Sequence, residues 1–350
     1  MSPSPRSVAV IGASGYAGGE LIRLLSTHPG MEFTFAGGRE STGRRVTDLH
    51  PHLAGAVPND MEMEPVDAAV VASRAEFAFL SLPHGVSSEL APPMLEAGVR
   101  VIDLAGDFRL PVEAYPEWYG FEHPSPPWLA KAVYGLPELF ASEIAGASLV
   151  ANPGCFPTPV ILGLAPLMKA GLIETGRVLV DGKTGVSGAG KASDATAYAA
   201  TEESVRPYRV PKHQHTPEME RFLEALGGKA ASISFVPHLV PAVRGVLVTC
   251  YAPLAGTAST EELTSCLTEA YAQAPFVRVL PAGEMVDAKR TRGSNVVELQ
   301  AVADPRTFTA VVVGTLDNLV KGAAGQAIQN FNLMARFEET LGLPTAGMYP

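Results

Sequence analysis

A single cysteine lies where the chain turns from an expected strand into an expected helix. The stretch Ala151-Asn-Pro-Gly-Cys155-Phe-Pro-Thr158 follows the apolar run 147–150 and precedes a helical pattern over 159–170. The free N–H groups and positive dipole end of a helix favour the thiolate, which is the reactive form. Gly154 lets the backbone pass close to a substrate. Most unpaired cysteines are instead buried and inert, so nucleophile and structural thiol both remain open, and we adopt the nucleophile as the hypothesis.

A reactive thiol needs a partner for proton transfer. The segment Lys212-His-Gln-His-Thr-Pro-Glu218 offers His213 and His215, and its Thr-Pro pair predicts a helix that begins near Pro217. Both histidines would then lie in the preceding loop. A His-x-His pair can also bind a metal, but no Cys or carboxylate stands at familiar zinc spacing. Acid–base work is therefore favoured over a metal site, and we predict no metal.

A glycine pattern near the N-terminus predicts dinucleotide binding. The β-branched run 7–11 leads directly into Gly12-Ala-Ser-Gly15-Tyr-Ala-Gly18, and a helical pattern follows to Leu25. The spacing is G-x-x-G-x-x-G rather than G-x-G-x-x-G. Gly12 allows the tight turn, Gly15 lets a pyrophosphate approach the helix, and Gly18 permits close helix–strand packing. A purely structural turn is the alternative, and the strand and helix on either side argue against it.

The next expected strand, 32–36, ends at Gly37-Gly-Arg39-Glu-Ser41. An acidic residue about 20 positions after the glycines would bind a ribose hydroxyl. Arg39 with Ser41 suits a 2′-phosphate instead, which favours NADP. Glu40 leaves NAD open if its side chain faces the ribose.

Basic residues follow several other expected strands. Arg109 and Arg244 are candidates for holding a carboxylate or phosphate, although either could form a surface ion pair. Residues 182–191 form a glycine-rich loop that contains Lys183 and Lys191 and could wrap an anion. This loop lacks the spacing of a Walker phosphate-binding loop.

The remaining pattern predicts the architecture. Strand-like runs at 77–82, 99–104 and 147–150 complete the first domain, and 111–137 reads as an irregular surface excursion in which His123 is a solvent or packing residue. Runs at 178–181, 231–236, 245–252, 295–303 and 307–315 have few helices between them, which indicates an α+β domain. Ser259 and Glu262 form an expected capping box. A long helical pattern over 318–338 is expected to return to the first domain.

Composition excludes several classes of function. The 350 residues are 47% hydrophobic and carry a net charge of −10, so binding to nucleic acid or an anionic membrane is not expected. No apolar run is long enough to span a membrane. Three cysteines are too few for a disulfide scaffold and suggest a reducing compartment, so we expect a cytoplasmic protein.

Seven motifs together resemble a known family. They are Gly12-Ala-Ser-Gly-Tyr-Ala-Gly18, Leu82-Pro-His-Gly-Val-Ser87, Asp107-Phe-Arg-Leu110, Asn152-Pro-Gly-Cys-Phe-Pro-Thr158, the segment 183–190, His213-Gln-His-Thr-Pro-Glu218, and Asp317-Asn-Leu-Val-Lys-Gly-Ala-Ala-Gly-Gln326. In this order, nearly end to end, they resemble the N-acetyl-γ-glutamyl-phosphate reductases of arginine biosynthesis. The chain is also broadly similar to aspartate-semialdehyde dehydrogenase, which shares the fold and the Cys/His chemistry.

The resemblance implies an NADP-dependent reductase of a small acyl phosphate, with Cys155 as the nucleophile and His215 as the acid/base, a role that His213 could share. It implies cofactor contacts at Gly12, Ser14, Gly15, Tyr16, Gly18, Arg39, Ser41, Pro83, Gly188 and Asn318. It implies substrate contacts at Arg109, Asn152, Lys183, Ser187, His213, Glu218 and Arg244. A homotetramer or homodimer is also implied.

The expected fold is α/β, with a Rossmann-type dinucleotide-binding domain over 1–154 plus 316–350. A catalytic and dimerisation domain of α+β type, with a largely antiparallel sheet, is expected over 155–315. Three rival functions stay open: a carrier-protein-linked aminoadipate-phosphate reductase, aspartate-semialdehyde dehydrogenase, and a non-enzymatic dinucleotide-sensing regulator.

Overall fold

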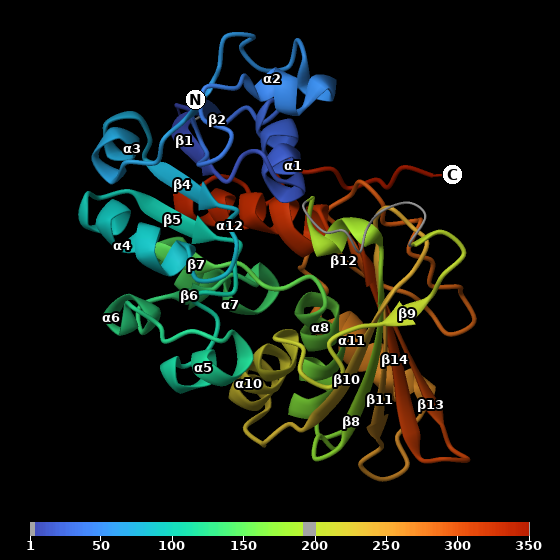
Figure 1. Ribbon diagram of the computed structural model, residues 1–350. Helices are drawn as coiled ribbons and strands as arrows, with labels where there is room; N and C mark the ends of the chain where they lie inside the picture. Colours follow the sequence, from blue (N-terminus) through green and yellow to red (C-terminus); the bar gives the residue numbers. More distant parts are fainter. Residues whose placement is uncertain (1–3, 192–200, 350) are drawn as a thin grey trace. The chain divides into compact units, whose positions relative to one another are not determined.

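The computed structural model describes residues 4–191 and 201–349, and the chain divides into two compact units. The first comprises Met1–Pro153 and Ala323–Leu343, and the second comprises Gly154–Gly322 and Pro344–Pro350. Residues 316–322 and the last few residues therefore belong with the second unit. Figure 1 shows the elements of each unit.

The first unit is built on a parallel sheet of seven described strands in the order β3-β2-β1-β4-β5-β7-β6. The strands are β1 (Arg6–Ile11), β2 (Met31–Gly37), β3 (Met63–Glu64), β4 (Phe77–Leu80), β5 (Arg100–Asp103), β6 (Val133–Tyr134) and β7 (Leu149–Ala151). Fully buried apolar runs such as Val8 to Ile11 are typical of a parallel sheet covered on both faces. This doubly wound order confirms the Rossmann-type prediction.

Helices cover both faces of this sheet (Figure 1). The described helices of this unit are α1 (Tyr16–Leu25), α2 (Val46–Leu49), α3 (Ala68–Arg74), α4 (Ser87–Glu96), α5 (Tyr115–Trp118), α6 (Pro126–Leu129), α7 (Pro137–Gly146) and α12 (Gly325–Ala335). Helices α3 and α4 pack together, and α12 packs against α1 and α7. The predicted helix over 318–338 is thus shorter: a π-helical turn, Val320–Ala324, precedes α12.

The segment 111–137 lies largely at the surface, as predicted, but it is not irregular throughout. It contains a short 3₁₀ turn, α5, α6 and the edge strand β6, and Tyr115 is fully buried. The Tyr115 hydroxyl donates to the carbonyl of Asp107 at 2.6 Å, and His123 Nε2 lies 2.7 Å from the same oxygen. His123 is thus a packing residue, and the aromatic segment fixes the loop after β5.

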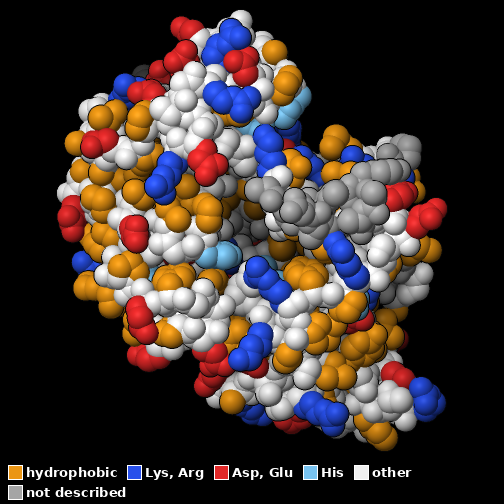
Figure 2. Space-filling view, in the orientation of Figure 1, with side chains coloured by type: hydrophobic (Ala, Val, Ile, Leu, Met, Phe, Trp, Pro, Cys, Tyr) orange, Lys and Arg blue, Asp and Glu red, His pale blue; other side chains and the backbone are white. Residues whose placement is uncertain are grey.

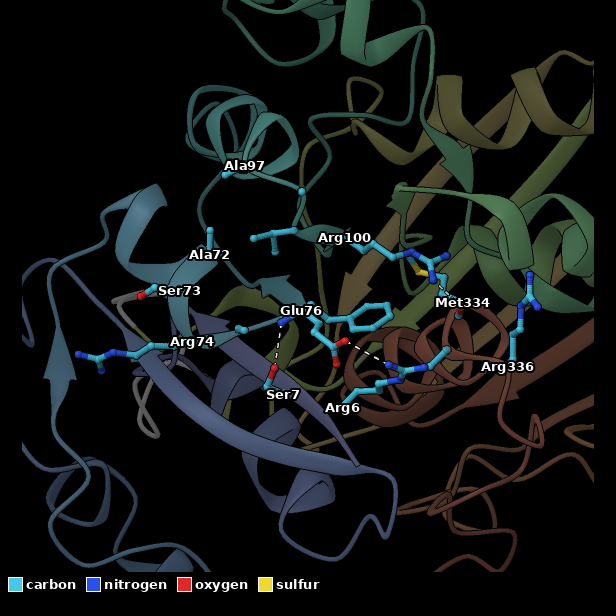
Figure 3. A pocket seen from close by; sticks show the side chains of 15 residues that line it. Arg6, Ser7, Ala72, Ser73, Arg74, Glu76, Ala97, Arg100, Met334 and Arg336 are labelled. Atoms are coloured by element: carbon cyan, nitrogen blue, oxygen red, sulfur yellow. Dashed lines mark hydrogen bonds and ion pairs between the residues drawn. The ribbon is translucent and has the colours of Figure 1, made fainter. Parts of the chain in front are cut away.

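A cavity of about 510 Å³ lies at the amino ends of β1, β4 and β5 and is lined by four arginines (Figure 3). Helices end at this edge of a parallel sheet, and their free carbonyls attract cations. The Arg100 guanidinium donates to the carbonyls of Ala147 and Met334, while Arg6 pairs with Glu76 at 3.1 Å. Burial and the charges of Arg336 and Arg6 lower the pKa of Arg100. Arg100 therefore compensates the ends of α7 and α12, at the sheet edge opposite the glycine turn.

The second unit is built on a mixed sheet in the order β12-β13-β14-β11-β8-β10-β9. The strands are β8 (Val178–Thr184), β9 (Arg206–Pro207), β10 (Ile233–Leu239), β11 (Val246–Pro253), β12 (Val277–Val279), β13 (Val297–Asp304) and β14 (Thr309–Leu316). Only the pairs β8–β10 and β12–β13 are parallel; the other neighbours are antiparallel. The prediction of a largely antiparallel sheet is confirmed.

Three helices pack on one face of this sheet: α8 (Pro157–Lys169), α10 (His215–Gly227) and α11 (Thr260–Ala270). Helix α8 is buried along almost its whole length because it lies between the sheet and both other helices. Helix α11 begins with the predicted capping box of Ser259 and Glu262. No described helix is long and apolar enough to cross a membrane.

Candidate active site

A buried carboxylate fixes the backbone of the turn at Gly154 and Cys155, which we call the cysteine turn. Cys155 is partly exposed and lies two residues before the start of α8. The backbone N–H of Gly154 donates to Oε1 of Glu218 at 2.8 Å, and the Glu218 side chain is fully buried. The Thr158 N–H and hydroxyl both donate to the Gly154 carbonyl, at 3.2 and 3.1 Å. Glu218 and Thr158 therefore fix the backbone that carries the thiol.

The two histidines have different surroundings. Helix α10 begins at His215 rather than near Pro217, so His215 is its first residue and the predicted loop placement is wrong for it. The reason is a cap: Nδ1 of His213 accepts the backbone N–H of His215 at 3.1 Å. His215 instead packs its ring on Gly154, where a Cβ would overlap Nε2 of the imidazole. Glycine at 154 thus allows the His215 imidazole to lie directly beside the cysteine turn.

Aromatic rings enclose this pair. The Phe156 ring contacts both edge to face, with its centroid 6.1 Å from that of His213 and 6.0 Å from that of His215, and Phe235 is 5.3 Å from His213. The histidine rings are 4.7 Å apart, and both residues are buried. The two imidazoles are therefore packed in a largely apolar cluster beside the cysteine turn.

The other two cysteines differ from Cys155. Cys250 is fully buried in β11, and burial raises the pKa of its thiol to about 12. Cys266 lies in α11, where burial and the charge of Glu269 raise its pKa, and its Sγ lies 3.6 Å from the Pro166 carbonyl. Both thiols are therefore unreactive at neutral pH.

The sequence reasoning missed Gly322 in the π-helical turn. A Cβ at Gly322 would lie 2.8 Å from the Cβ of Cys155, so only glycine fits without displacing the cysteine. Asp317 holds the start of this segment, because its Oδ1 accepts the N–H groups of Leu319 and Val320. The glycine in the Asp317–Gly322 motif indicates a backbone position with little room. Its neighbour Cys155 is too distant in the sequence to be predicted.

Four predicted residues gather beside that segment. Asn318 accepts the N–H of Gly245 at 2.8 Å and donates to the Ser187 hydroxyl at 3.0 Å. Gly188 lies against the Asn318 amide, and Arg244 reaches Asp317 at 3.6 Å. The structure thus brings Ser187, Gly188, Asn318 and Arg244 together, and it gives the Asn318 side chain the task of joining two loops.

The structure gives Lys183 a different position from the predicted one. It lies within β8, not in a loop, because the strand continues through Thr184 between β10 and β11. The neighbouring Gly182 faces Phe156, so alternation along the strand turns Lys183 to the opposite face. There it pairs with Asp181 at 2.9 Å. This placement does not support a substrate contact at the cysteine turn.

Asn152 is also structural in its geometry. It is fully buried in the first unit, and its amide donates to the Ala323 carbonyl at 3.2 Å. Its Oδ1 accepts from the Asn330 amide at 3.0 Å. Asn152 therefore ties the end of β7 to α12.

The glycine turn after β1 is shaped by close backbone packing. Gly12 has φ +82°, and a Cβ there would overlap the backbone of Ser81, while a Cβ at Gly18 would overlap the backbone of Gly12 and Ala13. Gly15, by contrast, has room and precedes the first turn of α1. Its exposed side is where a phosphate would meet the helix N-terminus. The arrangement fits a dinucleotide, and Ser14 and the exposed Tyr16 lie on the same turn.

His50 supports this turn and was missed. Its Nε2 lies 2.8 Å from the Ala13 carbonyl, and its ring occupies the space that a Cβ at Gly19 would need. Nothing in the local pattern around His50 reports a contact with residues 37 positions earlier.

The loop after β2 carries Arg39 and Ser41, the residues predicted to bind the 2′-phosphate of NADP. Arg39 is exposed, and its guanidinium makes no hydrogen bond or ion pair with any described residue. Ser41 is buried, and the Thr42 hydroxyl closes the turn on the carbonyls of Gly38 and Arg39, at 2.9 and 3.0 Å. Because β2 pairs with β1 up to Gly37 and Ile11, this loop emerges beside the glycine turn.

The loops after β4 and β5 are joined by buried carboxylates. Asp107 accepts the N–H groups of Gly85 and Ser88 at 2.9 Å, which places it at the start of α4 and leaves Pro83 exposed. Burial raises the pKa of Asp107. Burial and the charge of Asp107 raise the pKa of Asp103 to about 7.

Arg109 is buried beside these carboxylates. Its guanidinium donates to the Leu104 carbonyl at 2.8 Å, and its charge partly offsets the rise in the Asp103 pKa. Of the two arginines predicted to bind an anion, Arg109 belongs to the first unit and Arg244 to the second. Within 4–191 and 201–349, no group of three or more His, Cys, Asp or Glu side chains could hold a metal ion.

Comparison with known proteins follows the same division. Residues 7–147 match the NAD-binding domain of semialdehyde dehydrogenases, and residues 155–318 match their dimerisation domain. The N-acetyl-gamma-glutamyl-phosphate reductase of Magnetococcus marinus is 44% identical over 98% of both chains. The chain belongs to the N-acetyl-gamma-glutamyl-phosphate reductase family. The reductase of Symbiobacterium thermophilum is 45% identical over 98% of this chain and 99% of its own.

Solved structures of more distant proteins share the fold of this reductase family member. Aspartate semialdehyde dehydrogenase II from Vibrio cholerae aligns with a TM-score of 0.72 at 19% identity, covering 95% of this chain and 99% of its own. The Candida albicans aspartate semialdehyde dehydrogenase, solved with NADP, aligns with a TM-score of 0.71 at 16% identity and the same coverage.

Proposed function

We propose that this protein reduces N-acetyl-γ-glutamyl phosphate to the corresponding semialdehyde with NADPH, through a thioester on Cys155. The observation that carries the proposal is the cysteine turn. A partly exposed thiol precedes a helix, its backbone is fixed by Glu218, and the His215 imidazole packs on the adjacent glycine. We infer the identity of the acyl group from the family, and the mechanism from the residues of the cysteine turn.

Acylation is the first task of these residues. The Cys155 thiolate attacks the acyl carbonyl, the C–S bond forms, and the carbonyl electron pair moves to oxygen. Collapse of this intermediate breaks the bond to the phosphate oxygen and leaves a thioester. His215 accepts the thiol proton before attack, because its ring lies against the residue next to the thiol. His213, whose Nδ1 is committed to capping α10, orients His215.

Reduction and release follow. Bound NADPH supplies a hydride to the thioester carbonyl. The resulting alkoxide collapses to the aldehyde and breaks the C–S bond, and His215 returns its proton to the departing sulfur, which regenerates the Cys155 thiol. A thioester suits this step because it accepts hydride far more readily than a carboxylate would.

NADP rather than NAD is the cofactor that the loop after β2 favours. Gly12 and Gly18 leave a turn that any side chain would fill, and Arg39 offers an uncommitted guanidinium at the next strand end. The remaining contacts inferred for the cofactor are at Ser14, Gly15, Tyr16, Ser41, Pro83, Gly188 and Asn318. Ser187, Arg109 and Arg244 are the substrate contacts that we retain.

A homodimer is the assembly that we infer, and two such dimers would give a tetramer. The sheet face of the second unit that α8, α10 and α11 leave uncovered carries a row of paired apolar residues across four strands: Leu179, Tyr251, Val311 and Val302. Leu179 and Tyr251 are 43% and 41% exposed, which is high for apolar residues in the middle of a sheet. In Figure 2, hydrophobic side chains gather over the strands of this unit, at the lower right. The occupant is a second copy, because this unit matches a dimerisation domain. Charged substitution of Tyr251 should yield monomers in sedimentation; an unchanged assembly would exclude this face.

A cytoplasmic location is inferred from the chemistry. The mechanism needs a reduced thiol and NADPH, and none of the three cysteines, all of which the structure describes, forms a disulfide. Both requirements suit a reducing compartment.

The test of function is the reverse reaction. Phosphate-dependent reduction of NADP is expected with N-acetylglutamate semialdehyde and not with aspartate semialdehyde. Turnover with aspartate semialdehyde alone would assign the chain to that dehydrogenase. Arg206, Arg209 and Lys212 form a modest basic rim that would suit an acidic carrier protein, so a carrier-linked aminoadipate substrate belongs in the same panel. Activity confined to it would overturn the proposal.

A further inference from the structure

Tyr208 lies at the candidate site, yet neither the motifs nor the comparisons assign it a role. It follows the short strand β9, whose pairing with β10 and the bond from the Tyr208 N–H to the Pro237 carbonyl at 3.0 Å fix its backbone. Its ring centroid lies 5.5 Å from that of His213, edge to face. His213 in turn stands 4.7 Å from His215, which packs beside the cysteine turn. The phenol therefore belongs to the same aromatic cluster as both imidazoles.

The Tyr208 hydroxyl is uncommitted. It makes no hydrogen bond with any residue in 4–191 or 201–349, and the side chain is only partly buried. Other buried tyrosines in the chain do find acceptors: Tyr115 donates to Asp107, and Tyr271 to the Leu162 carbonyl at 2.6 Å. The hydroxyl of Tyr208 is partly exposed and is therefore available to a ligand.

The phenol of Tyr208 stays protonated at neutral pH. Burial raises its pKa, the negative charge of Cys155 raises it further, and Arg209 opposes both effects. Tyr208 is thus a neutral O–H donor within electrostatic reach of the nucleophile. A neutral donor stabilises negative charge on an oxygen without giving up its proton.

We propose that the Tyr208 hydroxyl donates a hydrogen bond to the acyl oxygen of the tetrahedral intermediates on Cys155. As the C–S bond forms, the carbonyl electron pair moves to that oxygen, and the phenol O–H approaches the new charge. No proton is transferred. When phosphate leaves, the electron pair returns to the carbonyl bond, and the hydrogen bond from Tyr208 to the thioester oxygen weakens. The same contact recurs when the hemithioacetal oxygen carries charge during reduction.

This inference rests on the proposed function for its acyl group, but not for its chemistry. Any ester that acylates Cys155 passes through a similar oxyanion. A packing role for the ring predicts instead that only loss of the ring matters, because the contact with His213 is made by the ring and not by the hydroxyl.

The test uses Y208F, which keeps the ring and removes the hydroxyl, with Y349F as the matched control. Tyr349 is 66% exposed and packs on Lys289 in the same unit. Reverse turnover of N-acetylglutamate semialdehyde is measured together with the acylation burst from p-nitrophenyl acetate. In Y208F both kcat and the burst rate should fall about a hundredfold, as for loss of one oxyanion donor. KM, NADP affinity and the melting temperature should stay near wild type, and Y349F should match wild type throughout.

Three results would overturn the inference. Y208F could retain kcat within about twofold, or raise KM with kcat unchanged, which would place the hydroxyl on a group that does not react. It could also lose turnover with an unchanged ester burst. If wild type acylates normally with the ester but does not use N-acetylglutamate semialdehyde, the proposed function fails while the burst still decides the role of Tyr208.

Discussion

The glycine turn after β1 and the cysteine turn before α8 both lead into the N-terminus of a helix, yet they are built in opposite ways. The glycine turn depends on residues that lack a side chain: Gly12 and Gly18 allow neighbouring backbone groups to pack closely. The cysteine turn depends instead on side chains from α10: Glu218 accepts the Gly154 N–H, and the His215 ring packs on Gly154 beside Cys155. Only Gly154 and Gly322 are needed there to make room.

The difference explains why one turn can bind and the other can react. Exposed backbone N–H groups at a helix N-terminus suit a phosphate, which must be released unchanged. A covalent step instead needs groups that change protonation during the reaction, and these must come from side chains. Substitutions at the two turns should therefore have separable effects on binding and on chemistry.

The largest effect is expected at the thiol. C155S should lower kcat by several orders of magnitude, because an alcohol is far less nucleophilic than a thiolate at neutral pH. NADPH binding, measured by its fluorescence, should be unchanged. C266S is the control, since Cys266 is a partly exposed thiol on α11 with a raised pKa. Substantial turnover by C155S, or inactivity of C266S, would contradict the assignment.

Exchanging glycines for alanine in the two turns should separate binding from chemistry. In G12A the added Cβ meets the Ser81 backbone at a positive φ, so the Kd for NADPH should rise about tenfold or more. In G154A the Cβ meets the His215 ring, so kcat should fall while the Kd for NADPH holds. If both variants lose NADPH affinity, or if both lose kcat, the proposed division of binding and chemistry between the two turns is contradicted.

A smaller effect is expected at Arg39. The R39A substitution removes a charge-assisted contact to a 2′-phosphate, which corresponds to roughly a ten- to hundredfold rise in KM for NADPH. KM for NADH should change little, because NADH lacks that phosphate. Initial rates with both cofactors provide the measurement, and E40A serves as the neighbouring control. Equal shifts for the two cofactors would exclude the 2′-phosphate role.

The smallest effect concerns a charge that the glycine-turn unit buries. The pKa of Asp103 is raised to about 7 in the folded protein, from an ordinary value near 4. The unfolded chain therefore ionises first, and wild type should lose stability relative to D103N as pH rises from about 4 to 7, with no further change above. Melting temperatures across this range should differ by a few degrees. A pH-independent difference would mean that Asp103 stays ionised.

Much of the fold follows from local sequence patterns. Buried runs such as Val8 to Ile11 predict strands because both faces of a parallel strand are covered, and the Ser259 capping box marks its helix correctly. Helix α4 is not evident from its sequence, because it contains Pro92 and Pro93, residues that usually signal a break. Here the Ser88 carbonyl, which Pro92 cannot bond, accepts the Ser125 hydroxyl at 3.0 Å. That compensation comes from 37 residues away.

The candidate site was predictable where one short motif carries the chemistry and not where distant contacts do. Cys155, the histidine pair and the glycines stand in compact motifs. Lys183 was misplaced because the strand runs past a glycine that faces Phe156. Gly322 could not be found, because it matters through its close approach to Cys155, which is distant in the chain, and Tyr208 stands outside every motif.

The central claim is a thioester on Cys155, and the most direct test omits phosphate. Enzyme mixed with NADP and N-acetylglutamate semialdehyde, without phosphate, should produce a burst of NADPH stoichiometric with active sites and then stop. Mass spectrometry should locate the acyl group on the peptide that contains Cys155, and added phosphate should restart turnover and remove it. Absence of the burst in an enzyme that turns over normally with phosphate, or an acyl group on another residue, would contradict the account.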